Sequence, residues 1–330
     1  KIKKMLKTLK YLIFIIISSV LMYFAFKDQN ISEIISMMSY VDYKFILISM
    51  LCGGLAIVSR GLRWVFLIES LGYKASNKNC IHTVAVGYLT NLLIPRAGEI
   101  SRCTSLQQVE KIPFDKLFGT IILERLIDLA ILIILVFIAF IYKFAEISLF
   151  FEKVLGTNSS TNSNNTLLII LGVFGAIFLF TQLFQKRLSK FSLFQKIKNI
   201  INGLKDGLAS FNNLKEKTPF IIHTIFIWLM YIIMTFICFF AIEETKHLNI
   251  LDGIYITIIG GLGMIVSSQG GIGSYHLAVK LGLNGIGIAM QPALLFAFAV
   301  HTAQTLMTIL FGLFSSFILL STKKNVEKNK

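Results

Sequence analysis

One short stretch of the sequence, NLLIPRAGEISR, places charged side chains beside helix-breaking residues at the end of an apolar segment. Pro95 and Gly98 should interrupt a helix there, and a helix that restarts after Gly98 would offer free backbone N–H groups to an anion. Arg96 and Arg102 supply positive charge, and Glu99 could pair with them or accept a proton. The stretch therefore predicts a binding site for a phosphate-bearing headgroup. The alternative is an interfacial loop whose arginines reach lipid headgroups at the membrane surface.

Three charged residues, Glu124, Arg125 and Asp128, lie inside the apolar run 117–142. Ionisable side chains at such a depth are costly, so they indicate a role in the interior of the bundle. Glu124 and Asp128 are four residues apart and share one helix face, with Arg125 beside them. We expect this group to pair with the charges of the NLLIPRAGEISR stretch, either as a charge relay or as a structural contact.

Arg60 and Arg63 are three residues apart at the end of another predicted helix, and Trp64 follows them. This spacing puts both arginines on one helix face, where they are candidate ligands of a headgroup phosphate. The alternative is that they anchor the helix at the cytoplasmic interface, where arginine and tryptophan are common.

A second break, SSQGGIGSYH, separates two later apolar runs. Its closely spaced glycines permit positive φ and a close approach of the backbone, although close helix packing alone would also explain them. No Lys-Ser or Lys-Thr pair follows, so the stretch is not a nucleotide-binding loop. The candidate site residues of this break are Gln269, Gly270, Gly271, Gly273 and His276. Further candidates for lining the same cavity, or for simple interhelical hydrogen bonds, are Asn91, His301 and Gln304.

The composition identifies the solvent that surrounds these segments. Hydrophobic residues make up 55% of the 330 residues, charged residues make up 15%, and the mean hydropathy is +0.74. Soluble domains average about 45–50% apolar and about 25% charged residues. Several apolar runs here approach the length of about 20 residues that crosses a bilayer. The sequence therefore predicts an all-α polytopic membrane protein and excludes a soluble enzyme.

The net charge of +15 comes from residues that lie between the apolar runs. Membrane topology and contact with the anionic cytoplasmic leaflet explain this charge, so nucleic-acid binding is not predicted. The four cysteines and five histidines show neither a disulfide framework nor the spacing of metal ligands. No metal and no other cofactor is predicted.

Loop charges orient the apolar segments. The lysine-rich N- and C-terminal ends are predicted to be cytoplasmic by the positive-inside rule. The segment 80–116 must then begin and end inside, whereas 251–291 must begin and end outside. The chain is expected to form six spanning helices and two oppositely oriented re-entrant hairpins. The apolar segments are 9–27, 44–68, 80–94, 117–142, 166–184, 219–242, 251–267, 272–290 and 292–320.

The order of these segments predicts an inverted-topology repeat, which is typical of secondary transporters with a site near the membrane midplane. The whole chain, 1–330, is interpreted as one polytopic domain. Its pseudo-repeats are 1–142 and 166–320, joined by an outside loop at 143–165. Apolar residues at steps of three and four across 188–211 predict an amphipathic helix on the cytoplasmic leaflet, or an ordinary helical connector.

The three motifs NLLIPRAGEISR, ERLID and QGGIGSYH, in this order, resemble the flippase-like family typified by the transmembrane half of lysylphosphatidylglycerol synthases. The chain differs from the family pattern at Gln269, where proline is common, and at His276, where glutamate is common. Its Pro95–Gly98 spacing is also one residue shorter than in many members. The 330 residues include no soluble aminoacyl-transferase domain, so the resemblance implies lipid translocation and does not imply lysyl transfer.

The leading hypothesis is an integral protein of a bacterial-type inner membrane that binds and translocates a phospholipid or a lipid-linked phosphate. Arg96 and Arg102 would hold the anion, and Glu124 with Asp128 would balance charge. One alternative is a non-transporting membrane partner of a separate lipid synthase or glycosyltransferase. Another is an intramembrane transferase that acts on a lipid phosphate, with Glu99 or Asp128 as its acid or base.

Overall fold

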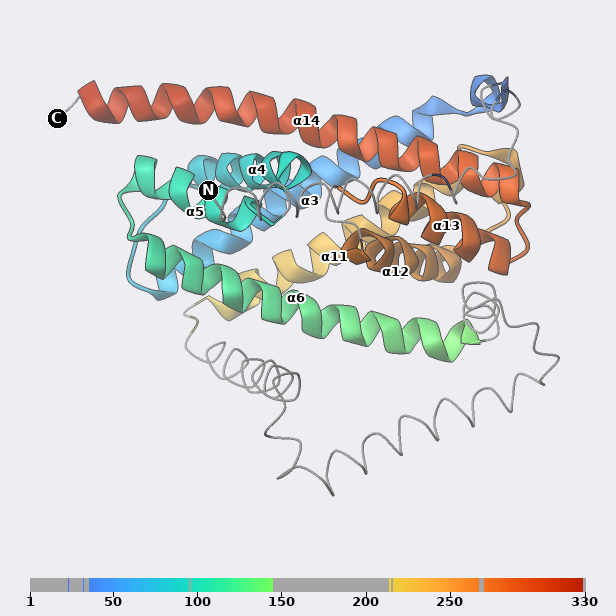
Figure 1. Ribbon diagram of the computed structural model, residues 1–330. Coiled ribbons are helices and arrows are strands. Elements are labelled where there is room, and N and C mark those ends of the chain that lie inside the picture. Colours follow the sequence, from blue (N-terminus) through green and yellow to red (C-terminus); the bar gives the residue numbers. More distant parts are fainter. Residues whose placement is uncertain are drawn as a thin grey trace, which may run out of the picture. The chain divides into compact units, whose positions relative to one another are not determined.

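The computed structural model describes residues 36–94, 96–144, 216–266 and 270–328, together with Tyr23, Ser32 and Leu214. This part of the chain is helical and contains no strand (Figure 1). Its α-helices are α3 (Tyr43–Ser70), α4 (Asn77–Leu93), α5 (Gly98–Glu110), α6 (Phe114–Tyr142), α11 (Lys217–Phe239), α12 (Ile250–Val266), α13 (Ser274–Gly285) and α14 (Met290–Lys328). Short 3-10 turns lie at Met38–Tyr40 and Glu243–Thr245.

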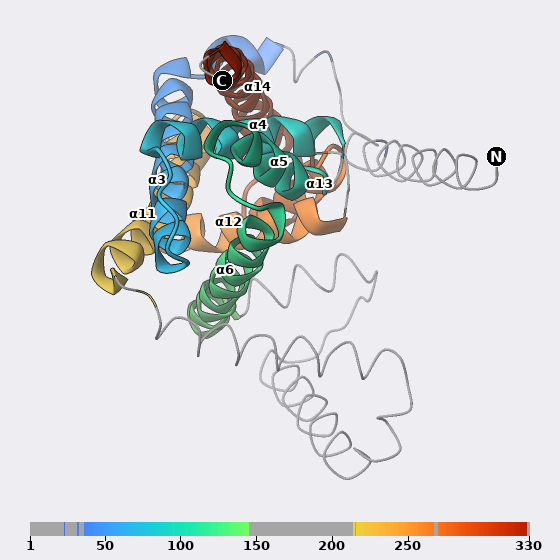
Figure 2. The same cartoon turned by 90° about the vertical axis from the view of Figure 1, so that its left-hand side faces the viewer.

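Helices α3 and α11 pack side by side in opposite directions (Figures 1 and 2). Phe45, near the start of α3, contacts Phe240 just after the end of α11, and Ser59 in α3 contacts His223 near the start of α11. Cys52, Ala56 and Met230 form part of the buried seam between them. The pair supplies the frame against which the other helices pack.

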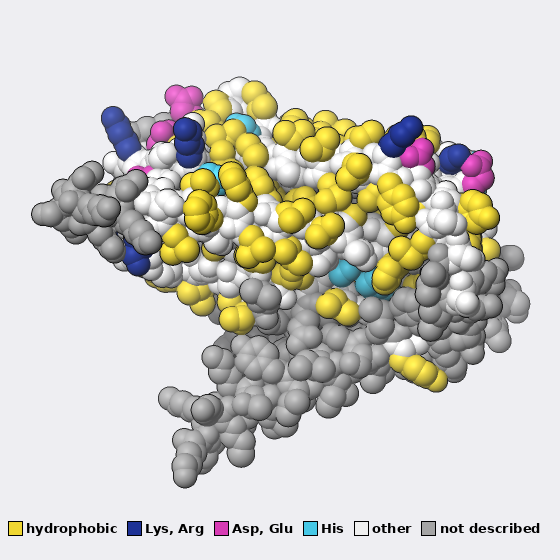
Figure 3. Space-filling view, turned by 90° about the horizontal axis from the view of Figure 1, so that it is seen from above, with side chains coloured by type: hydrophobic (Ala, Val, Ile, Leu, Met, Phe, Trp, Pro, Cys, Tyr) yellow, Lys and Arg dark blue, Asp and Glu magenta, His cyan; other side chains and the backbone are white. Residues whose placement is uncertain are grey.

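Three of the described helices are long and apolar enough to cross a bilayer, namely Tyr43–Ser70, Lys217–Phe239 and Met290–Lys323. Each exposes large apolar side chains, such as Leu51 of α3, Ile225 of α11 and Leu310 of α14. Figure 3 shows apolar side chains across the middle of one face and charged side chains at its two ends. This pattern suits a protein surrounded by lipid.

Helices α4 and α5 form the first hairpin. Its turn is tight because Arg96 adopts φ +61° and because Asn91 Oδ1 accepts a 2.7 Å hydrogen bond from the Gly98 N–H. At the open end of the hairpin, Glu110 accepts hydrogen bonds from the Ser76 N–H and the Asn79 side chain. The expected helix break is therefore present, and α5 begins at Gly98 itself, not after it.

Gly98 has no room for a side chain. A Cβ there would lie 2.2 Å from the Gly87 carbonyl oxygen and 2.5 Å from the Asn91 amide. We expect Gly98→Ala to lower the free energy of unfolding by about 1–3 kcal/mol, because backbone cannot yield as a flexible side chain would. Gly54→Ala is the matched control, since nothing lies within 4 Å of its added Cβ. Thermal melts in detergent check this, and equal melting of both variants would contradict the close packing.

Helices α12 and α13 form the second hairpin. Gly270, Gly271 and Gly273 in its turn have φ values of +60°, +82° and +83°, which side-chain-bearing residues rarely adopt. The two helices pack closely, because a Cβ on Gly260 would lie 2.7 Å from the Tyr275 ring. The glycine-rich break predicted from the sequence is therefore a turn between two helices.

The turns of the two hairpins meet. A Cβ on Gly270 would lie 2.7 Å from Leu92 Cδ1, near the end of α4. Helix α14 runs alongside both hairpins (Figure 1), with Gly312 against Leu89 of α4 and His301 against Gly270. Two segments far apart in the sequence thus bring their helix breaks together on one side of a long helix.

The all-α membrane class is confirmed, while the six spans and the re-entrant placement of the hairpins stay predictions. Helix α6 contains the expected segment 117–142. The predicted helices at 166–184 and 188–211 lie outside the described residues, as does the predicted helix at 9–27 except for Tyr23. The chain divides into two compact units. The first unit comprises Lys1–Glu124 and Leu214–Lys330, and the second comprises Arg125–Asn213, of which only residues 125–144 are described.

Candidate functional site

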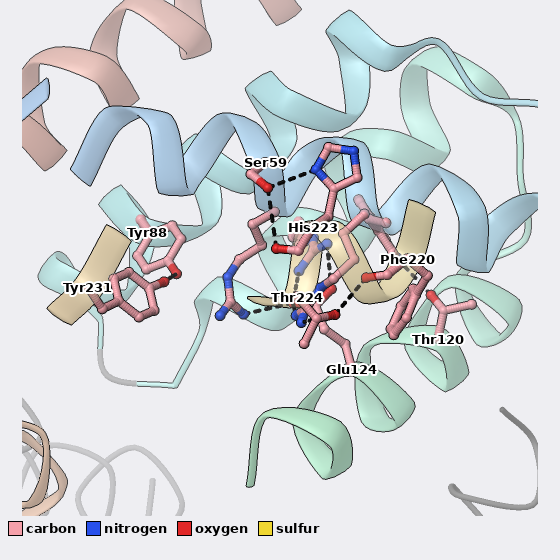
Figure 4. A network of polar contacts seen from close by, with 12 residues as sticks. Ser59, Tyr88, Thr120, Glu124, Phe220, His223, Thr224 and Tyr231 are labelled. Carbon is pink, nitrogen blue, oxygen red and sulfur yellow. Dashed lines mark hydrogen bonds and ion pairs between the residues drawn. The ribbon is translucent and has the colours of Figure 1, made fainter. Parts of the chain in front are cut away.

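Glu124 is the centre of a buried network of charges (Figure 4). Arg60 Nη1 donates to Glu124 Oε1 at 2.8 Å, and Arg102 donates through two nitrogens, to Oε1 at 3.1 Å and to Oε2 at 2.9 Å. Arg63 Nη2 lies 3.3 Å from Glu124 Oε1. The four side chains are between 0% and 4% exposed. One carboxylate from α6 therefore ties together arginines from α3 and α5.

Neighbouring side chains fix these guanidinium groups. Trp64 donates from Nε1 to Thr120 Oγ1 at 2.8 Å, and its ring lies 3.8 Å below the Arg102 guanidinium carbon. This is the geometry of a cation–π contact, which gains strength in a site without water. Arg63 Nη1 donates to Thr224 Oγ1 of α11 at 3.3 Å. The network thus connects α3, α5, α6 and α11.

Three guanidinium groups share the Glu124 carboxylate in a buried place. A second buried carboxylate, Asp128, lies one turn further along α6. Arg102 is held by a two-pronged contact, the strongest arrangement that an arginine makes with a carboxylate. The network can therefore hold these helices together.

The other two charges of the ERLID motif are placed differently. Asp128 is buried, one turn beyond Glu124 on the same helix, whereas the Arg125 side chain is exposed. The ion-pair partners that surround Glu124 thus include Arg60, Arg63 and Arg102, which come from other helices.

The NLLIPRAGEISR residues do not stay together. Arg102 is buried in the network, while Arg96 is exposed in the turn of the first hairpin and makes no hydrogen bond or ion pair within the described residues. Asn91 caps the first turn of α5 through its bond to Gly98. Glu99 is half-buried. Arg96 is therefore the cation of this stretch that is presented at the turn.

His276 of the second hairpin and His301 of α14 are both buried, and their ring centroids lie 4.8 Å apart. His301 Nε2 donates to the Gly270 carbonyl at 2.7 Å, so an interhelical hydrogen bond is present at this position. The Gly273 N–H donates to His276 Nδ1 at 3.3 Å. Gln304 is half-buried one turn further along α14, and Gln269 lies outside the described residues.

Sequence reasoning missed two polar contacts in the same interior. Ser59 Oγ lies 2.8 Å from His223 Nδ1, beside the arginines of α3, and the hydroxyl groups of Tyr88 and Tyr231 lie 3.0 Å apart (Figure 4). Each pair joins residues more than a hundred positions apart. The available signal was a polar residue within an apolar helix, which by itself does not identify a partner.

Comparisons with known proteins agree with this description. The family model described as the lysylphosphatidylglycerol synthase TM region matches residues 11–312. A UPF0104 membrane protein of Methanocaldococcus jannaschii is 30% identical over 129 residues, which is 38% of this chain and 38% of that relative. No solved structure gives a significant match. The chain is thus a multi-pass membrane protein that belongs to the family of the lysylphosphatidylglycerol synthase transmembrane region.

Proposed function

We propose that the protein binds the phosphate-bearing headgroup of a phospholipid or lipid-linked substrate where its two hairpin turns meet, and moves it between the leaflets. The observation that carries this proposal is the contact of the turns, Leu92 against Gly270. Non-helical backbone inside a bilayer is tolerated only where protein covers it or where it lines a wet cavity. Two such turns in contact are the arrangement expected of a transport site between broken helices.

The proposal includes the predicted topology. Both hairpins would be re-entrant from opposite sides, within an inverted repeat of six spanning helices. The antiparallel packing of α3 and α11 supports this, because equivalent helices of two inverted halves run in opposite directions. The lysine-rich termini would be cytoplasmic, in a bacterial-type inner membrane with an anionic inner leaflet.

Arg96 is the proposed headgroup ligand. Its side chain is exposed in the turn of the first hairpin, and no carboxylate neutralises it within the described residues. A guanidinium group binds phosphate through two parallel N–H groups. Arg102 is less suited to a direct contact, because Glu124 already occupies two of its nitrogens.

The network around Glu124 has a supporting role in this account. It joins the first hairpin, through Arg102, to the α3–α11 frame and to α6. Its three guanidinium groups would attract an anionic headgroup that enters the interior. Asp128, buried one turn away, is the proposed counter-charge as access alternates.

The test is reconstitution of the purified protein into vesicles that carry fluorescent phosphatidylglycerol or phosphatidylcholine. A membrane-impermeant quencher then reports how fast each lipid moves between leaflets. We expect faster movement than in protein-free vesicles, with a preference for a headgroup of net negative charge. Equal rates with and without protein, for every headgroup, would favour a non-transporting partner of a separate enzyme.

A further inference from the structure

We propose that His276 and His301 form a proton-binding site that controls the turn of the second hairpin. The site stands on the geometry of the turn, whereas its coupling to lipid movement rests on the proposed function. Histidine is the side chain that gains and loses a proton near neutral pH. Here two of them are buried side by side at the place where the hairpins touch.

The hydrogen bonds of the turn depend on the protonation state of His276. The Gly273 N–H donates to His276 Nδ1, so this nitrogen must carry a lone pair and the ring proton must sit on Nε2. A second proton would turn Nδ1 into a donor that faces another donor. Protonated His276 therefore cannot keep the bond that begins α13, and the turn must change.

His301 behaves differently. Its Nε2 donates to the Gly270 carbonyl, which leaves Nδ1 able to take a proton without loss of that bond. Two imidazolium rings 4.8 Å apart would repel each other, so the pair holds one added proton at a time. His301 is thus a neighbour that can carry the proton while the turn stays closed, and His276 is the residue whose protonation opens it.

The surroundings contain few competing charges. Tyr275 lies on α13 beside the pair and also stacks against His301, and Lys280 lies one turn further along α13. From α14 the other ring in contact is Phe298, and the one charged residue of α12, Asp252, is in the first turn at the opposite end of that helix. No described carboxylate faces the two rings, so an added proton would raise the positive charge at the turn.

The consequence lies at the contact of the hairpins. Gly270, whose carbonyl His301 holds, is the residue that meets Leu92, and Leu92 precedes Arg96 by four positions. A proton on His276 would break the bond from Gly273, three residues along the same turn, and would add positive charge near the proposed headgroup ligand. Proton uptake and binding of an anionic headgroup would then favour each other, as linked equilibria require.

Hydrogen exchange in the detergent-solubilised chain tests the proton site without a transport assay. After correction for intrinsic exchange, the protection of residues 270–277 should be constant at alkaline pH. Below about pH 6.5 it should fall by up to about tenfold per pH unit. Residues 108–118, which contain no histidine, are the internal control and should show constant protection. The proposal would be overturned if the protection of residues 270–277 changed with pH no more than that of the control segment between pH 8 and pH 5.

Two conservative variants identify the residue. The Asn oxygen can replace Nδ1 as acceptor but cannot be protonated, so His276→Asn should keep the turn protected at every pH. The Gln amide can replace Nε2 as donor, so His301→Gln should keep the pH response. If His276→Asn kept the pH response of the parent, His276 would not be the residue that opens the turn. The same conclusion would follow if the pH response were lost in His301→Gln and kept in His276→Asn.

The coupling is tested in vesicles with a pH gradient and fluorescent phosphatidylglycerol. The parent rate should depend on the gradient, and the rate of His276→Asn should not. If the turn responds to pH but no lipid moves, the proton site stands and the proposed function is rejected. If the parent moves lipid at a rate that does not depend on the gradient, the coupling is rejected and the proposed function stands.

Discussion

Replacing Glu124 with glutamine is expected to lower the free energy of unfolding by about 3–5 kcal/mol, because breaking a buried ion pair leaves uncompensated charge. The substitution keeps the size of the side chain and removes the one carboxylate shared by Arg60, Arg63 and Arg102. These guanidinium groups would then stand together, buried, with no counter-charge from Glu124. Denaturant titration and thermal melts in detergent measure the loss.

The controls use the same helix and the same network. Arg125→Ala removes an exposed charge next to Glu124 and should change the free energy of unfolding by less than about 0.5 kcal/mol. The double variant Glu124→Gln, Arg63→Gln should lose less than the sum of the single losses, because it removes one repelling charge with the carboxylate. If Glu124→Gln melts like the parent, water reaches the network and its assignment as a structural tie is wrong.

Removal of the Arg96 charge should have the largest effect on transport. We expect Arg96→Gln to slow the movement of fluorescent phosphatidylglycerol by about 10- to 150-fold, which corresponds to one charge-assisted hydrogen bond of about 1.5–3 kcal/mol. The melting temperature should not change, since the side chain is exposed and holds no partner within the described residues. Arg96→Lys should fall between the parent and the Gln variant, because an ammonium keeps the charge and loses the planar fork.

Arg125→Ala is again the matched control, as another exposed arginine of the described chain. It should transport at the parent rate. Full activity in Arg96→Gln would exclude Arg96 as the headgroup ligand and would leave the second hairpin as the candidate. A parent-like preference for anionic headgroups in that variant would point to the buried arginines as the source of selectivity.

Local features of the fold followed from the sequence because single residues dictate them. Glycines that adopt positive φ precede α13 at 270–273, and the Gly98 backbone allows α4 and α5 to approach closely. Expected apolar segments such as 44–68 and 251–267 agree closely with α3 and α12. The segment expected at 272–290 is shorter as a helix, since α13 ends at Gly285 and Gly287 has φ +95°.

The partners of the charged residues could not be read in the same way. Arg60 and Glu124 are 64 positions apart, and Ser59 and His223 are 164 positions apart. Only the packing of the helices decides that Arg102 faces Glu124 while Arg96, six positions earlier, stays in the turn. The spacing of charges along one helix predicts a shared face, but it does not predict which other helix covers that face.

The central claim is that a headgroup passes where the two hairpin turns meet, and a cross-link between the turns tests it most directly. Leu92→Cys places its Sγ near the present position of Leu92 Cγ, which lies 4.0 Å from a Cβ on Gly270, so Gly270→Cys can form a disulfide with it after a small adjustment. A cysteine at the positive φ of Gly270 costs about 1–2 kcal/mol, so each single variant is measured beside the pair. We predict that oxidation stops lipid movement in the double variant only, and that reduction restores it. Movement at the same rate in the oxidised and the reduced double variant, with the cross-link verified, would contradict the account.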